Sequence, residues 1–340
     1  MKIAIHHRNG SFSDQWINYC EQHNMDYKIV DCYSNGIVEE LKQFDILLWH
    51  WHHNDYKAQL FGRQLAYAVE YTSIQMFPDR NTVWYFDDKI GQRYLLEAIA
   101  APLIDSYVFY DKKSAIEWIS NRSEWPIVFK LKGGAGSRNV KLIPSRSEAL
   151  RLVNIAFGKG FSPYSGWEYF KGRVKQYKDK IISWKQLLRS SIRIVVRPDY
   201  LKLMPKERGY LYFQDFIGEN ECDNRIIVIG DKAFAIKRYN RRNDFRASGS
   251  GKIEYPDNES IDKRLLTISF EIKNALRVQA IAFDYVYHDN EPKLIEISFG
   301  FTSKVYEPCK GYWEEDSLNW HPGPIRPQEW IIEDLIRATP

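Results

Sequence analysis

Apolar runs of strand length alternate with amphipathic stretches over the first 86 residues. A stretch with a capping-box-like start at Ser11 follows the first run, and residues 57–71 show a second helical pattern. Strands that alternate with helices predict a parallel sheet, on which ligands collect at the carboxyl ends of the strands. The apolar runs are KIAIHH, YKIVDC, FDILLWHW and TSIQMF.

Histidines follow the first and third of these runs, where a ligand would be expected. Adjacent histidines on an extended chain point to opposite faces, which disfavours a metal site built from them. We favour a hydrogen-bonding lining of a substrate cleft, and simple exposure in loops is the alternative. The residues concerned are His6, His7, His50, His52 and His53.

The pattern becomes mixed after residue 87. A helix is expected over 88–100, and short strands and helices follow up to a helix that begins near Ser147. Beyond residue 208, the runs GYLYFQDFI, NRIIVIG and KAFAIKR predict antiparallel strands, and a helix over 263–280 precedes the strand pair AFDYVYH and PKLIEIS. We therefore predict an α/β protein in which a parallel-sheet domain is followed by α+β lobes.

The amino-acid composition excludes several classes of protein. The 340 residues are 44% hydrophobic and 27% charged, which is typical of a globular protein, and this length predicts two or three lobes. A net charge of +4 is too small to indicate nucleic acid as a partner. We find no apolar run of transmembrane length, no signal-peptide pattern and no CxxC pair, so we expect a soluble cytoplasmic protein without disulfides or zinc.

A glycine-rich segment, KLKGGAGSRNV over 130–140, directly follows the apolar run PIVF. The backbone N–H groups of such a hairpin can wrap a phosphate, with Lys130 and Lys132 supplying positive charge. An ordinary turn is the plainer interpretation, because neither GxGxxG nor a complete Walker motif is present.

Two carboxylates interrupt the last strand pair. Asp284 and Glu296 lie twelve residues apart across HDNEP, and a three- or five-residue loop centred on Asn290 would place them opposite each other on one face. Two hard oxygen ligands placed in this way suit Mg²⁺. A two-residue loop would instead put them on opposite faces, and pairing of each with a nearby Lys or Arg is the alternative to a metal site.

A run of cations follows the strand KAFAI. Arg238 and Arg246 belong to a set of five Lys and Arg within ten residues, which continues into the small-residue loop ASGSG. Arginine forks bind carboxylate and phosphate oxygens through two hydrogen bonds, so the segment predicts an anion pocket as readily as a solvated face.

Taken together and in this order, the segments resemble the ATP-grasp superfamily of carboxylate–amine ligases, most of all its ribosomal-protein glutamate ligase branch. The similarity covers nearly the whole chain and rests on segments that follow one another in the family's order. These are an N-terminal α/β region, a helix that starts with Asp-Lys (DK), the strand end VFK with the loop GGAGS, the hinge strand YFQDFI, a D-x-R segment, the IKR…DFRAS run and the final D…E pair. It implies a pre-ATP-grasp domain at 1–86 and two lobes that grip ATP, at 87–213 and 214–340.

The resemblance also implies roles for residues. Arg238 and Arg246 match arginines that hold the transferred phosphate or acyl phosphate, and Asp284, Glu296 and Ser298 match magnesium ligands. The family motif is usually Glu-x-Asn, so Ser298 is a departure and would hold a second Mg²⁺ less firmly or through water. The ATP-binding matches are Lys89 and Lys130 for the phosphates, Gly133, Gly134, Ala135, Gly136 and Ser137 for the loop over them, Gln214 for the adenine amino group, and Asp215, Phe216 and Ile217 for the hinge backbone and apolar wall.

The activity implied by the resemblance is ATP- and Mg²⁺-dependent joining of a carboxylate to an amine through an acyl phosphate. Its substrates would be small or carrier-linked molecules, such as a sugar acid or an amino acid. One alternative is an ATP-grasp phosphotransferase that acts on an alcohol. Another is a non-enzymatic module that binds an anion or nucleic acid, which the low net charge disfavours.

The segment 165–208 is the least typical part of the chain. It holds 12 Lys and Arg against 4 Asp and Glu, with aromatic residues between them. We interpret this basic insert either as a lid or docking surface for an anionic partner, or as an amphipathic helix with a solvated basic face.

Overall fold

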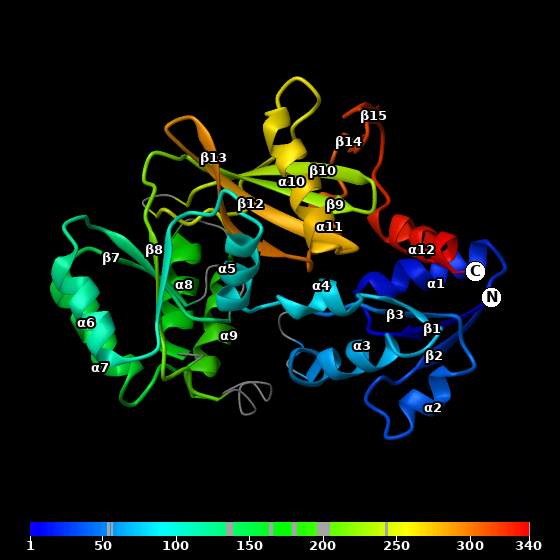
Figure 1. Cartoon of the computed structure of the whole chain (residues 1–340), viewed down its shortest axis with the longest axis horizontal. Helices are drawn as coiled ribbons and strands as arrows, with labels where there is room; N and C mark the ends of the chain where they lie inside the picture. Colours follow the sequence, from blue (N-terminus) through cyan, green and yellow to red (C-terminus); the bar gives the residue numbers. More distant parts are fainter. Residues whose placement is uncertain are drawn as a thin grey trace.

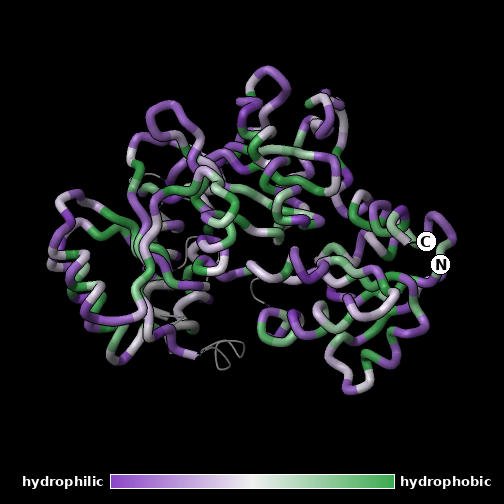
Figure 2. The backbone as a smooth tube through the Cα atoms, in the orientation of Figure 1, coloured by the Kyte–Doolittle hydropathy of each residue, from purple (hydrophilic) through white to green (hydrophobic). Residues whose placement is uncertain are grey.

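The computed structural model describes residues 1–52, 55, 57–133, 139–162, 166–178, 182–195, 205–241 and 244–339. Within them the strands form three sheets, which follow one another along the long axis of the molecule (Figure 1). The backbone is most apolar where strands cross the middle of each sheet and most polar in the outer loops (Figure 2). The predicted α/β class with a parallel N-terminal sheet is confirmed.

The first sheet is parallel, with the strand order β2-β1-β3-β4. Its first helix begins as the sequence predicts, because the Ser11 hydroxyl accepts a hydrogen bond from the N–H of Ser13 and caps the helix. The short helix α2 was not expected from the apolar pattern. The elements are β1 (Lys2–His6), α1 (Phe12–Gln22), β2 (Asp26–Val30), α2 (Ile37–Leu41), β3 (Ile46–Trp49), the π-helical turn η1 (Ala58–Gly62), α3 (Arg63–Val69), β4 (Gln75–Phe77) and α4 (Arg80–Trp84).

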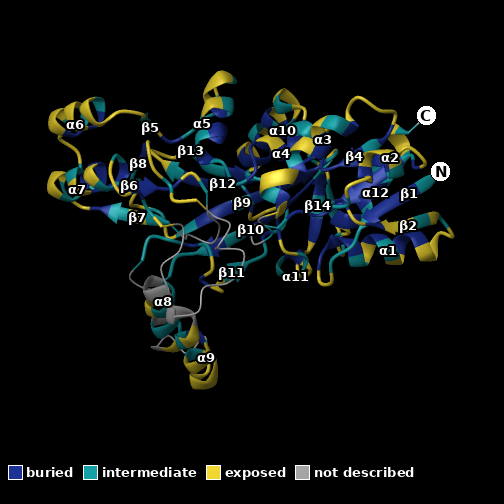
Figure 3. Cartoon of the chain, turned by 90° about the horizontal axis from the view of Figure 1, so that it is seen from below, coloured by how far each residue is buried: buried dark blue, intermediate teal, exposed yellow. Residues whose placement is uncertain are grey.

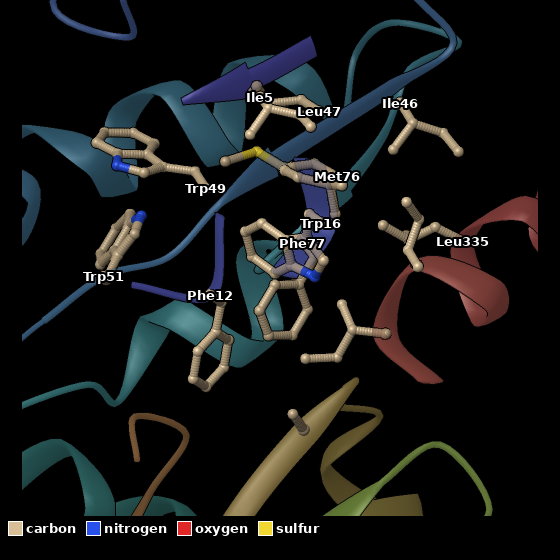
Figure 4. Close-up of a cluster of buried hydrophobic side chains, with 14 of the residues drawn as sticks. Ile5, Phe12, Trp16, Ile46, Leu47, Trp49, Trp51, Met76, Phe77 and Leu335 are labelled. Atoms are coloured by element: carbon tan, nitrogen blue, oxygen red, sulfur yellow. The ribbon is translucent and has the colours of Figure 1, made fainter. Parts of the chain in front are cut away.

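Large aromatic side chains fill the core beside this sheet (Figure 4). Helix α12 (Pro327–Ala338), near the other end of the chain, contributes Leu335 to this core and packs against α1. The Trp16 indole N–H donates to the Gln328 carbonyl oxygen at 3.0 Å, inside the core. The same core continues to Phe234 in the third sheet, so the N-terminal sheet shares its interior with that sheet.

Two of the histidines near the carboxyl ends of the first and third strands bind backbone N–H groups of neighbouring segments, after β2 and at the start of α1. The His6 Nδ1 atom accepts a hydrogen bond from the Cys32 N–H at 3.0 Å, and the His50 Nδ1 atom accepts one from the Phe12 N–H at 3.1 Å. The His50 ring also stacks on Phe12 with 3.7 Å between centroids. Neither ring lines the cavity described below, and His53 lies outside the described residues.

The second sheet is antiparallel, with the order β5-β8-β6-β7, and it has its own apolar core. Strands β6 and β7, which flank the glycine-rich segment, pair with each other in antiparallel register, as the sequence predicted. The elements are β5 (Ser106–Phe109), α6 (Lys112–Asn121), β6 (Ile127–Lys130), β7 (Val140–Ile143), α7 (Arg146–Ala156), α8 (Gly166–Lys178), α9 (Trp184–Val195) and β8 (Leu211–Asp215).

The third sheet is antiparallel, with the order β13-β12-β9-β10-β14-β15 and β11 beside β10. Helix α5 packs against β13, and α10 covers β9 and β12. The domain boundaries expected at residues 87 and 214 stay a proposal. The elements are α5 (Lys89–Ala98), β9 (Cys222–Ile229), β10 (Lys232–Tyr239), β11 (Ile253–Glu254), α10 (Lys263–Leu276), β12 (Ala280–His288), β13 (Glu291–Ser298), α11 (Ser303–Tyr306), β14 (Gly311–Glu314) and β15 (Trp320–Pro322).

Candidate functional site

A cavity of about 380 Å³ lies between the second and third sheets. Strands β6 and β8 form one wall, strands β9, β10, β12 and β13 form the other, and residues 244–248 border it. One part of the lining is apolar and the other is charged. The apolar part includes Ile104, Val128, Phe216, Ile217, Val286 and Ile295, and the charged part includes Lys130, Asp223, Arg238, Arg246, Asp284 and Glu296.

Asp284 and Glu296 are cross-strand partners in the register of β12 and β13. The turn between the strands has two residues, Asp289 and Asn290, both with positive φ, and this length alone would put the carboxylates on opposite faces. A bulge corrects the register, because Tyr285 pairs with Leu294 and the next pair is Asp284 with Glu296, which leaves Ile295 unpaired. Both carboxylates therefore line the cavity.

Two arginines hold Asp284. The Arg225 Nη1 atom donates to both carboxylate oxygens, at 3.1 and 3.2 Å, and the Arg238 Nη2 atom lies 2.8 Å from Oδ2. Arg238 also binds Asp223 through two hydrogen bonds of 2.6 and 2.7 Å. The register explains the cluster, because Arg225 lies opposite Asp284 and Asp223 lies opposite Arg238.

This charged cluster is almost closed to water. Burial opposes ionisation of Asp284, but Arg225 and Arg238 outweigh it and hold the pKa of Asp284 below its usual range. Burial, together with the Asp284 carboxylate, raises the pKa of Asp223. Asp284 is thus a carboxylate at neutral pH, held in place before any ligand arrives.

Lys130, at the end of β6, faces this cluster from the opposite wall. Its side chain is buried, and burial lowers the pKa of Lys130 to about 8, although the negative charges of Glu296 and Asp284 partly counteract the shift. Lys89, at the start of α5, lies behind Glu296 with 3.7 Å between Nζ and Oε2. The Asp88 carboxylate caps α5 by accepting from the Gly91 N–H at 2.9 Å, which fixes the position of Lys89.

The strand β8 and the residues after it form the apolar end. Gln214 is buried, and its Nε2 donates to the Ser106 hydroxyl at 3.0 Å and to the Ile295 carbonyl at 3.3 Å. The Asp215 carboxylate accepts from Arg122 at 2.7 Å, so its side chain holds the strand in place. Phe216 meets Phe245 edge to face, with 5.5 Å between ring centroids.

The remaining predicted residues occupy different places. Arg246 lines the cavity, and its Nε and Nη2 donate to Asp244 at 2.9 and 2.8 Å. Gly133 lies against Asp87, whose Oδ2 would be 3.2 Å from an added Cβ. Ser298 does not line the cavity, and its hydroxyl accepts from the Gly300 N–H at 3.2 Å. Gly134, Ala135, Gly136 and Ser137 lie outside the described residues.

The donor set suits a magnesium ion that arrives with a nucleotide. Among the described residues, no group of three or more His, Cys, Asp or Glu side chains could hold a metal by itself. Mg²⁺ usually takes one or two protein carboxylates and completes its shell with water and substrate phosphates. Asp284 and Glu296 are the carboxylates that could meet that need. In the structure each is also paired as the alternative expected, Asp284 with Arg225 and Arg238 and Glu296 with Lys89.

Several residues that line the cavity were not predicted from the sequence. Asp223 and Arg225 were noted as a D-x-R segment but given no role, although two charges at alternate positions of an apolar strand indicate one polar face. Asn240 and Phe245 also line the cavity. Their place depends on how the segment after β10 folds back, for which the apolar pattern holds no signal.

Comparison with known proteins agrees with this arrangement. No protein-family model matches the chain. The alpha-aminoadipate–LysW ligase LysX of Saccharolobus solfataricus is 24% identical over 212 residues, which cover 62% of this chain and 60% of that protein. The chain thus matches less than two thirds of that relative.

Solved structures match over much more of the chain. A RimK-domain ATP-grasp protein of Sphaerobacter thermophilus superimposes with a TM-score of 0.52, 14% identity and coverage of 90% of this chain and 94% of that one. The D-alanine–D-alanine ligase of Bacillus anthracis, complexed with ATP, gives a TM-score of 0.57, 12% identity and coverage of 100% and 98%. The fold that the resemblance implied is confirmed, because the chain shares the ATP-grasp fold of these structures.

Proposed function

We propose that the protein is an ATP- and Mg²⁺-dependent ligase that joins a carboxylate to an amine. The observation that carries this proposal is the cavity between the two antiparallel sheets, in which an apolar slot leads to buried cations and a facing pair of carboxylates. A purine would fit the slot, and a triphosphate with Mg²⁺ would fit the charged end. The LysX relative, a ligase by name, and the ATP-bound ligase of the same fold support this direction.

The nucleotide base would lie between Phe216 and Ile295. Because both Nε2 hydrogens of Gln214 are used inside the protein, its Oε1 is the atom left to accept a hydrogen bond from an adenine amino group. The backbone after Asp215 would supply the remaining contacts. The phosphates would then extend toward Lys130, which would gain a partner for its buried charge.

The reaction would proceed in two displacements. An oxygen of the substrate carboxylate attacks the γ-phosphorus, the bond to the β–γ bridging oxygen breaks, and ADP leaves with that electron pair. The amine nitrogen then attacks the acyl carbon, the carbon–oxygen bond to phosphate breaks, and the nitrogen loses one proton. No protein nucleophile is required, so the protein contributes positioning and electrostatic stabilisation.

Each charged residue would have a stated part in this chemistry. Asp284 and Glu296 would hold Mg²⁺, which neutralises negative charge on the phosphates during transfer. Lys130 and Arg238 would bind the phosphoryl oxygens from opposite walls of the cavity. Arg246, at the border of the cavity, would orient the substrate carboxylate or the acyl phosphate.

Release of ADP tests the proposal. The purified protein is incubated with ATP and Mg²⁺, first with a panel of carboxylic acids including sugar acids and amino acids, then with the same panel plus amines, and products are identified by mass spectrometry. A ligase forms ADP, phosphate and an amide only when both substrates are present. A stable phosphorylated alcohol formed without an amine would show a phosphotransferase, and failure to bind ATP would refute both.

A further inference from the structure

Helix α9 presents a row of large apolar side chains to water. Trp184, Leu188 and Ile192 are 57%, 62% and 59% exposed, and their spacing of four residues places them on one side of the helix. We call these three residues the α9 ridge. Helices α8 and α9 project away from the rest of the chain (Figure 3), and none of the three ridge residues lines the cavity.

The ridge is not the face by which α9 packs on its neighbour. Helix α9 contacts α8, and it has a separate buried position at Ser190, with Leu187 half-buried. The ridge thus stays in water after the helix pair has formed. Contiguous exposed apolar side chains are uncommon on a soluble protein and mark a surface that meets a partner.

Charge identifies the kind of partner. The insert over 165–208 holds 12 of the 48 Lys and Arg but 4 of the 44 Asp and Glu, so the rest of the chain has 36 basic and 40 acidic residues. Lys185 and Arg189 are exposed and directly follow two of the ridge residues. Two exposed cations, Lys185 and Arg189, thus lie on the same helix as the apolar ridge, within the segment whose sequence is richest in basic residues. This combination favours an anionic surface with an apolar layer beneath it.

Other kinds of partner would account for either the apolar ridge or the positive charge, but not for both. A second copy of this chain would bring two basic inserts together, and like charges would repel. An acidic peptide would neutralise Lys185 and Arg189 but need not cover the ridge. The surface of an anionic bilayer meets both needs, because headgroups attract the cations while the ridge enters the boundary with the acyl chains.

We propose that the α9 ridge docks the protein reversibly on membranes that contain anionic lipids. Trp184 suits this position, because an indole is favoured at the boundary between headgroups and acyl chains. Among the described helices, none has the length and apolarity needed to cross a bilayer, so α9 would lie on the surface. The site would then act on substrates at or near the membrane.

The test is co-sedimentation of the full chain with vesicles of phosphatidylcholine alone or mixed with phosphatidylglycerol, at low and high salt. We expect at least about fivefold more protein on the mixed vesicles, and less at high salt, because each cation near an anionic surface adds attraction that salt screens. Equal binding to both kinds of vesicle, or to neither, overturns the proposal.

Two variants separate the contributions. One carries Trp184→Ser, Leu188→Ser and Ile192→Ser, and the other carries Lys185→Glu and Arg189→Glu. Each should lower binding to the mixed vesicles about tenfold or more, whereas the matched control Phe61→Ser, a residue 57% exposed outside the insert, should not. Retained binding by the ridge variant overturns the proposal, because charge alone would then hold the protein on the vesicles.

Further controls distinguish an error in the membrane-docking proposal from an error in the proposed ligase function. Both variants should keep wild-type thermal unfolding and wild-type ATP binding, since the altered side chains are exposed and do not line the cavity. A wild-type protein that elutes as a dimer, and a ridge variant that elutes as a monomer, would assign the ridge to a second copy and overturn the membrane assignment. If the wild-type protein does not bind ATP, the proposed ligase activity is refuted, and the conclusion from vesicle binding is unaffected.

Discussion

The two walls of the cavity differ in how they hold charge. On the third sheet, Asp223, Arg238, Asp284 and Arg225 form a buried chain of ion pairs with N–O distances from 2.6 to 3.2 Å. On the second sheet, Lys130 is buried without a direct ion pair in that chain, and burial lowers its pKa to about 8. The wall formed by the third sheet is stabilised by its own ion pairs, whereas the wall formed by the second sheet carries the buried cation of Lys130 at an energetic cost.

This difference indicates that the two walls have different functions. A network whose members satisfy one another keeps its geometry when no ligand is bound, as a metal site requires. A buried lysine gains much more from an arriving anion, because the anion replaces the hydration that burial removed. We therefore expect the third sheet to determine geometry and metal binding, and the second sheet to determine nucleotide affinity.

The largest effect is expected at Arg238, on stability. Arg238→Met removes the cation shared by two buried carboxylates, and leaving buried charges without a partner costs about 3–5 kcal/mol. Urea unfolding measures the loss. The control is Lys237→Met on the same strand, where the lysine pairs with Glu254 nearer the surface and about 1 kcal/mol or less is at stake. Similar midpoints for the two variants would contradict the network.

The next largest effect is expected at Glu296, on turnover. Glu296→Gln keeps the shape but removes the charge that would hold Mg²⁺, so ADP formation should fall about 100-fold or more. Thermal unfolding should hardly change, because the Glu296 side chain is 34% exposed. The control is Glu291→Gln, at the exposed start of the same strand. Turnover like that of the wild type in Glu296→Gln would refute the metal assignment.

A smaller effect, on nucleotide affinity and its pH dependence, is expected at Lys130. Lys130→Ala should weaken ATP binding about tenfold or more, whereas Lys141→Ala, exposed on the neighbouring strand, should not. The protonated lysine binds phosphate, and its pKa in the free protein is about 8. Affinity should therefore be full below pH 8 and fall as pH rises through it, by up to about tenfold per pH unit.

Lys130→Arg should remove this dependence, because a guanidinium stays charged to a pH of about 12 or above. Isothermal titration calorimetry with a non-hydrolysable ATP analogue across the alkaline range measures both variants. A wild-type affinity that is constant with pH would place Lys130 away from the phosphates.

The smallest effect is expected at Ser298. Its hydroxyl is engaged by the Gly300 N–H and does not line the cavity, so it would be a weak metal ligand at most. Ser298→Asn supplies a longer side chain with an amide oxygen, and should lower the Mg²⁺ concentration for half-maximal turnover about two- to fivefold. An unchanged Mg²⁺ dependence would exclude position 298 from the metal site.

The sequence predicted most elements because their local signals agree. The caps at Ser11 and Asp88 mark helix starts that the structure confirms, and each predicted apolar run became a strand of one of the three sheets. Strands β11, β14 and β15 and helix α12 were not predicted. Helix α2 was missed because its five residues are too few for a helical period to show. The packing of α5 on β13 was also out of reach, since sequence order gives no information on which sheet a connecting helix joins.

Parts of the site could not be predicted from the sequence, because they depend on the register of paired strands. The facing of Asp284 and Glu296 was expected from a three- or five-residue loop, but the structure reaches it through a two-residue turn and a bulge at Ile295. Residue counting cannot separate these routes, because each adds one residue to the hairpin. The cluster around Arg238 depends on the register of β9 with both β10 and β12, which is a property of paired strands.

The contact between helices α1 and α12 has a consequence for the newly made chain. Trp16 donates to the carbonyl of Gln328, and Leu335 belongs to the N-terminal core, so that core lacks part of its wall until helix α12 has left the ribosome. The first 86 residues would therefore keep aromatic surface uncovered while the chain between residue 87 and helix α12 is synthesised. Chaperone demand during translation, and poor solubility of that fragment when it is expressed alone, follow from this late closure.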